Sequence, residues 1–203
     1  NAMALEDTGP DSFIAGGLQL SDGVGVNAYV VRANTLYRNV QFGVRYIPQV
    51  TSNRRVLSTV ATTVTRSVAR GLALTDVALF MIADVVQVSA LLNRTSLSVL
   101  KLGTSTGAII KQTQVSAANA DLHCTDITNA GLLLTIACTV TQGTALPQSL
   151  LIAVDRELTF VQLPPGFYKH GNNTFVGQTV PLKTTALTVT TASTLVSVAE
   201  SEM

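Results

Sequence analysis

The five residues Gly103-Thr104-Ser105-Thr106-Gly107 match the G-x-S-x-G pattern, in which a tight turn between a strand and a helix exposes a serine nucleophile. Asp155 and His170 follow in the chain order that such a catalytic triad uses. A serine becomes nucleophilic only when a histidine takes its proton and a carboxylate orients that histidine. However, the segment 108–115 after the motif has the composition of a strand, not of the required helix. We therefore expect a Gly-, Ser- and Thr-rich turn here, with no catalytic residues, and a serine hydrolase using Ser105 is the alternative.

A second candidate site is the segment 164–173, whose Pro, Gly and Asn content is typical of a loop. It contains Phe167, Tyr168, Lys169 and His170. Exposed aromatic rings with a neighbouring cation supply contact area for a protein partner or a glycan. A solvated turn is the simpler interpretation of this loop, and a lectin-like carbohydrate-binding module is a further alternative function.

Neither a metal site nor a cofactor is predicted. A metal site needs several His, Cys or carboxylate ligands that converge. His123 and Cys124 are adjacent, and strand alternation would point them to opposite faces. Asp76 and Asp126 each follow a threonine, and we expect both to stabilise turns by bonding nearby backbone amides.

Arginines form one local basic set, in which Arg54, Arg66 and Arg70 would share one face of a strand. An anion contact is one interpretation of this set, and a solvated face is the one we favour. The chain as a whole carries 13 Lys and Arg against 12 Asp and Glu, a net charge of +1. This balance excludes a nucleic-acid binder that works by bulk positive charge.

Cys124 and Cys138 are the two cysteines of the chain and lie on either side of the turn-like segment 128–131. Two strands folded back at that turn would bring the sulfur atoms together, so a cross-strand disulfide is feasible. Two buried free thiols are the alternative. Asn93 and Asn172 each begin an N-x-Thr glycosylation pattern, which a Thr-rich chain also matches by chance.

The composition predicts an all-β protein. Of the 203 residues, 27 are Thr and 14 are Ser, about a fifth of the chain, and 47% are hydrophobic. Thr and Val are branched at Cβ and suit a pleated, half-buried surface. Short apolar stretches recur between Gly, Asn, Asp, Ser and Pro clusters, which is typical of strands and turns. These stretches are 13–17, 28–32, 40–47, 79–86, 97–102, 108–115, 132–140, 150–154, 158–163 and 186–191.

One segment, 54–72, is ambiguous between helix and strand, because valines recur at every fourth residue and also satisfy a period of two. Its Ser and Thr content favours a strand. The length fits one domain. We expect a tag remnant and N-terminal tail over 1–11, a single domain over 12–198 and a C-terminal tail over 199–203. The apolar runs are too short to span a bilayer.

A weak internal repeat relates two parts of the chain. Thr75-Asp76 and Thr125-Asp126 each precede an apolar strand, and Leu97 and Leu150, 53 residues apart, begin similar strands. The segment from Ser96 to Ile110 is similar to the third and fourth strands of a propeller blade. In these features the chain resembles β-propeller repeat proteins, whose blades are four-stranded antiparallel meanders of about 40 to 50 residues. A β-sandwich or jelly roll with the same strand spacing is the alternative architecture.

Low charge, abundant Thr and Val and the lack of converging chemical groups together predict a non-catalytic binding or assembly module. We expect it in a surface, secreted or particle-associated protein outside the cytoplasm. Strand edges pair with neighbouring chains unless charges block them, and charges make up only 12% of this chain. A protein partner or self-association as a homo-oligomer is therefore expected, with a glycan as the alternative ligand and no nucleic acid.

Overall fold

The structure is a computed structural model that describes residues 2–7, 9–19, 25–47, 63–88, 93–117, 120–144, 147–161, 174–175, 178–179, 182–189 and 195–201. Every regular element in these ranges is a β-strand, and strand pairing is antiparallel almost throughout, which confirms the predicted all-β class.

Most of the strands form three consecutive four-stranded meanders, each with neighbouring strands antiparallel. The first meander comprises β1 (Ala2–Asp7), β2 (Asp11–Gln19), β3 (Val26–Asn34) and β4 (Asn39–Tyr46). The second comprises β5 (Thr63–Leu74), β6 (Leu79–Val88), β7 (Asn93–Leu102) and β8 (Ile109–Val115). The third comprises β9 (Asp121–Ala130), β10 (Leu133–Thr141), β11 (Gln148–Asp155) and β12 (Phe160–Val161).

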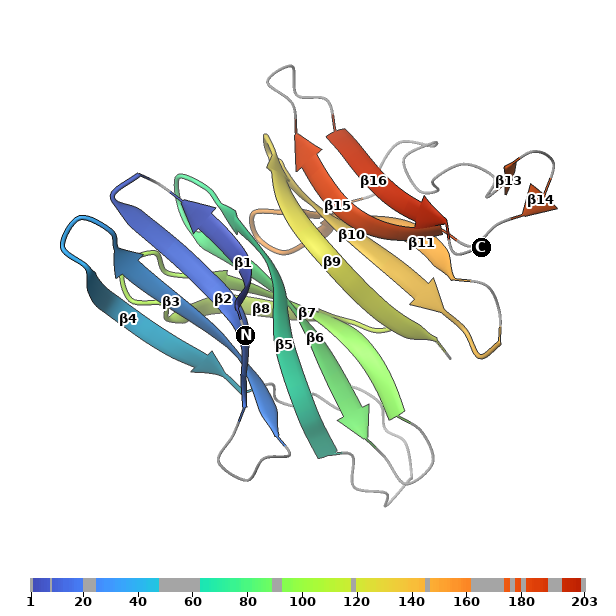
Figure 1. Ribbon diagram of the computed structural model, residues 1–203, viewed down its shortest axis with the longest axis horizontal. Helices are drawn as coiled ribbons and strands as arrows, with labels where there is room; N and C mark the ends of the chain where they lie inside the picture. The colour runs from blue at the N-terminus through green and yellow to red at the C-terminus, as the bar shows by residue number, and fades with distance from the viewer. Residues whose placement is uncertain are drawn as a thin grey trace.

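Two short hairpins follow, β13 (Thr174–Phe175) with β14 (Gln178–Thr179), and β15 (Leu182–Val189) with β16 (Leu195–Ser201). β15 lies against β9, β10 and β11 of the third meander. The first two meanders are joined into one eight-stranded sheet by a single parallel residue pair, Val26 of β3 with Arg66 of β5. Figure 1 shows the three meanders side by side along the long axis of the molecule.

Successive meanders pack face to face through two apolar cores. The core between the first and second meanders includes Phe13, Val30, Tyr46, Leu72, Leu79, Met81 and Leu100. The core between the second and third meanders includes Phe80, Ile82, Leu97, Val99, Leu122, Ile127, Leu134 and Ile136. The second meander is thus covered on both faces, which explains why β6 has an unbroken run of buried residues from Leu79 to Val85.

Close backbone contact between the second and third meanders depends on Gly71 of β5. A Cβ atom at this position would lie 3.0 Å from the backbone nitrogen of Ile127 in β9. A side chain there would meet backbone, which cannot rotate away, so glycine lets β5 and β9 approach.

The structure places a strand in each predicted segment as far as it describes them, including 63–72, although 158–163 contributes only the two residues of β12 because Leu158 belongs to the turn after Asp155. Residues 54–62 lie outside the described residues. Two boundaries differ from the expectation. Residues 2–7, expected in a tail, form β1 because they pair with β2, and β16 continues to Ser201. The turn expected at 128–131 lies at Gly131 and Leu132, where Gly131 has a φ of 71° and opens a two-residue hairpin loop.

The internal repeat is reproduced in one respect and differs in another. Leu97 and Leu150 both lie on the third strand of a four-stranded meander. Thr75-Asp76 lies in the turn between β5 and β6, but Thr125-Asp126 lies within β9 at a bulge opposite Ala137 and Cys138. The two Thr-Asp pairs are therefore not equivalent, and no propeller is identified among the described strands.

Candidate functional site: a buried carboxylate beside a disulfide

The predicted contact loop, Phe167, Tyr168, Lys169 and His170, lies outside the described residues, as does Asn172. The lectin-like alternative therefore remains a prediction. Asn93 is exposed at the first position of β7.

The G-x-S-x-G segment forms the turn between β7 and β8. The amide of Gly103 donates to the carbonyl of Ala108 at 2.9 Å, and the amide of Gly107 donates to the carbonyl of Gly103 at 2.8 Å. Ser105 is exposed at the tip of this turn. Strand β8 follows, in place of the helix that a nucleophile elbow requires. The local geometry is that of the hairpin turn expected from the composition.

Asp155 has a structural role at the end of β11. Its Oδ1 accepts hydrogen bonds from the backbone amides of Glu157 and Thr159, both at 2.8 Å, and so holds the turn toward β12. These bonds, that from Thr159 first, lower the pKa of Asp155. His170 is outside the described residues, so the described part of the chain does not bring the three residues of the serine hydrolase hypothesis together.

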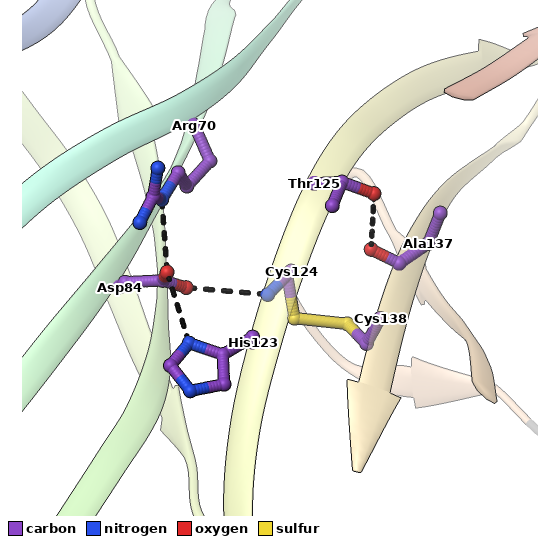
Figure 2. Close-up of a disulfide and its surroundings, with 7 residues drawn as sticks. All are labelled: Arg70, Asp84, His123, Cys124, Thr125, Ala137 and Cys138. Carbon is purple, nitrogen blue, oxygen red and sulfur yellow. Dashed lines mark hydrogen bonds and ion pairs between the residues drawn. A yellow bond between two sulfur atoms is a disulfide. The ribbon is translucent and has the colours of Figure 1, made fainter. Parts of the chain in front are cut away.

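Cys124 of β9 and Cys138 of β10 form a disulfide. The two residues are directly opposite each other in the strand register, and both side chains are buried in the core between the second and third meanders. Figure 2 shows the disulfide bridging the two strands beside the side chain of Asp84.

Asp84 of β6 is the buried acidic group next to this disulfide, with 4% of its surface exposed. Its Oδ2 accepts a hydrogen bond from Nε of Arg70 at 2.9 Å, and its Oδ1 accepts one from the backbone amide of Cys124 at 3.2 Å. Nδ1 of His123 lies 3.5 Å from Oδ2. Figure 2 shows Arg70, His123 and the Cys124 amide all directed at this one carboxylate. Asp84 therefore links the second meander to β9 of the third.

This cluster corrects one prediction. Arg70 was expected on a solvated face with Arg66, but its guanidinium is paired with Asp84 because the carboxylate is buried and needs a cation. Arg66 is exposed, and Arg54 lies outside the described residues. A sequence signal for Asp84 exists, since it is a single carboxylate at the centre of an otherwise apolar or uncharged strand, LFMIADVVQV.

The two Thr-Asp pairs also differ from the expectation that aspartate stabilises both turns. In the β5–β6 turn it is Thr75 whose Oγ1 accepts from the amides of Val77 and Ala78, while Asp76 pairs with Arg156 at 2.6 Å. Asp126 accepts from the amide of Ile127 within the bulged strand.

The Asp84 cluster does not resemble a metal centre. In the described ranges no group of three or more His, Cys, Asp and Glu side chains is placed to hold a metal ion. Both oxygen atoms of Asp84 already accept hydrogen bonds from protein donors. Its chemistry is that of an anchor between layers.

His123 is the titratable partner in this cluster, and its pKa is raised, first by the hydrogen bond with Asp84 and next by the carboxylate's charge, against the opposing effect of burial. The folded protein thus binds this proton more tightly than the unfolded chain does. The interaction stabilises the fold below the unfolded histidine pKa of about 6.5 and is lost as the pH rises through the raised folded pKa.

We expect Asp84→Asn to lower the pKa of His123, because the variant removes the negative charge that favours the protonated ring. Titration of the histidine ring signals by NMR measures this directly. Asp76→Asn is the matched control, since Asp76 is an exposed carboxylate paired with Arg156 on another turn. An unchanged His123 pKa in Asp84→Asn would contradict the assignment.

A different kind of site lies on the side of the first meander that faces away from the second. Following the register across β1, β2, β3 and β4, this outer face carries seven apolar residues. They are Leu5, Ile14, Leu18, Tyr29, Val31, Ala33 and Val40. Leu5, Leu18 and Val40 are 64%, 49% and 66% exposed. We refer to these seven residues as the outer apolar face.

Known protein families offer no match to this chain, and no curated protein matches it. Within the described residues there is no helix of the length and apolar character needed to cross a membrane.

Proposed function

We propose that the protein is a non-catalytic, β-rich module that works by assembling with other protein chains. The observation that carries this proposal is the outer apolar face, which leaves large side chains in water on one side of the first meander. Contiguous exposed apolar patches are rare on soluble monomers and mark interaction surfaces. Among the described residues, six of the eleven exposed large hydrophobic side chains fall between residues 5 and 47.

The arrangement of the meanders supports a module built for stacking. Each has four antiparallel strands, successive meanders pack face to face, and β5 lies against both β1 and β9. These features support the proposal that the meanders are blade-like units related to propeller repeats.

The Cys124–Cys138 disulfide supports a location outside the cytoplasm, on a surface, in a secreted protein or in a particle. Structural disulfides persist in oxidising compartments and are rare where thiols are kept reduced.

We expect the purified protein to self-associate with increasing concentration, because burial of the outer apolar face removes apolar surface from water. Size-exclusion chromatography with light scattering would give a mass above that of the 21.3 kDa chain. The mass should not fall at high salt, since screening weakens charge pairs and not apolar contacts. A monomer at high concentration would contradict assembly. Fluorophosphonate labelling that Ser105→Ala abolishes would contradict the non-catalytic assignment.

A further inference from the structure

We propose that the outer apolar face is covered by the same face of a second copy, so that two first meanders pack together about a two-fold axis. This inference rests on the proposed assembly function and names the surface and the partner. Four features support it: the apolar sequences of the strands, the way the chain covers its other sheet faces, the low charge of the outer apolar face and the area of that face.

The two central strands of the first meander, β2 and β3, have the sequences of strands that are buried on both sides. Phe13 and Ala15 of β2 are buried in the core toward the second meander, and Ile14 between them is apolar as well. The same holds in β3, where Ala28 and Val30 face the core and the intervening side chains are Tyr29 and Val31. Continuous apolar runs are typical of strands covered on both faces. In β6 such a run is covered on both faces, whereas the described strands leave one face of the first meander uncovered.

The chain covers its other meander faces with its own β-structure. The second meander is enclosed between the first and the third, and β15 lies against three strands of the third. The first meander is at the end of this series. A second copy supplies the kind of surface that covers a meander elsewhere in the molecule, which is a pleated sheet with apolar side chains at matching spacing.

The low charge of the outer apolar face favours a second copy of this chain over a strongly charged partner. The strand register places one acidic and one basic residue on the outer side of the first meander, Asp7 at the end of β1 and Arg45 near the end of β4. These two charges are opposite in sign, so the face has no net charge with which to steer an acidic or basic partner. The chain as a whole has a net charge of +1, so two copies approach without appreciable repulsion.

The outer apolar face is also large enough to form a specific interface between two copies. Four strands about 4.8 Å apart, with about eight residues each at about 3.3 Å per residue, give a sheet face of about 500 Å². Two such faces together bury about 1,000 Å², the lower bound for a specific interface. Because one patch contacts its own copy, the interface is isologous and closes as a dimer.

The test uses two exposed positions at opposite edges of the face, Leu5 on β1 and Val40 on β4. The double variant Leu5→Lys/Val40→Lys buries four uncompensated charges in the dimer, and we expect the dissociation constant to rise at least about 100-fold. Sedimentation equilibrium measures it. Leu132→Lys is the control, because Leu132 is also an exposed leucine, at 81%, but lies in the β9–β10 turn away from the first meander, and it should leave dissociation unchanged. Circular dichroism checks that all variants remain folded.

A charge-reversal experiment identifies the partner surface. The variant Leu5→Glu/Val40→Glu should also be monomeric alone, and mixing it with the Lys variant should restore dimers, since each Lys-bearing face then meets a Glu-bearing face. If both double variants still form dimers, or if mixing the Lys and Glu variants does not restore dimers, the isologous interface is wrong. Assembly of the wild type would then use another surface. A monomeric wild type would overturn both proposals.

Discussion

Replacing Asp84 with alanine is expected to lower the free energy of unfolding by about 3 kcal/mol, because removing one partner of a buried ion pair leaves the other groups uncompensated. The variant removes the acceptor for Nε of Arg70 and for the backbone amide of Cys124. The Cys124 amide is buried between two meanders, where water does not replace the lost bond. Urea unfolding followed by circular dichroism measures the change, provided that the denaturant slope stays constant.

Two comparisons make this expectation specific. Asp76→Ala removes an aspartate whose partner, Arg156, is 2.6 Å away in an exposed ion pair, and it should cost less than about 1 kcal/mol. Asp84→Asn keeps the side-chain volume and one acceptor oxygen, so its effect should lie between those of the two alanine variants. Equal stabilities of Asp84→Ala and Asp76→Ala would show that the carboxylate does not hold the meanders together.

The physical significance of Asp84 is that it links strands that are distant in sequence. Arg70 and Asp84 belong to the second meander, whereas His123 and Cys124 begin the third. Apolar contacts between two pleated sheets fix their separation but leave sliding less restricted, and directional hydrogen bonds restrict it. The serine hydroxyl of Ser67 has a similar role between the first two meanders, where it accepts from the amide of Ala28 and donates to the carbonyl of Tyr46.

The strand content could be predicted from the sequence because its cause is local. Branched side chains disfavour helices, and Gly, Asn and Asp mark the turns, so segments such as 79–86 and 97–102 were placed within a few residues of β6 and β7. The hairpin between β9 and β10 also has a local cause, since Gly131 adopts a positive φ. A hairpin that places Cys124 opposite Cys138 needs little further information.

The parts that the sequence did not predict depend on contacts between distant residues. Strand β9 is not recognisable from its sequence, DLHCTDITNA, because many of its side chains are polar. Residues 2–7 form the strand β1 because they pair with β2, and that pairing is not visible in their own sequence. The pairing of Arg70 with Asp84 requires the register of β5 with β6, which bulges shift at two places. The outer apolar face was missed for a different reason: the sequence of β2 shows that both sides are apolar, but it does not show which of them the chain itself covers.

Loss of the disulfide is expected to lower the free energy of unfolding by about 3 kcal/mol, because a cross-link that closes a loop of about 15 residues removes chain entropy from the unfolded state. The two cysteines are 14 residues apart. Both lie in the core between the second and third meanders, so the effect should appear in the global unfolding transition and not only in local opening of the hairpin. The measurement compares urea unfolding of the wild type with and without a phosphine reductant.

The double variant Cys124→Ala/Cys138→Ala separates the cross-link from other effects of the reductant. It should match the reduced wild type to within about 1 kcal/mol, the difference reflecting two buried sulfur atoms replaced by hydrogen. Its stability should not respond to the reductant at all. If the reduced and oxidised wild type unfold at the same urea concentration, the disulfide does not stabilise the β9–β10 hairpin beyond what packing in the core provides. The hydrogen bonds of Asp84 would then be the principal specific link between the second and third meanders.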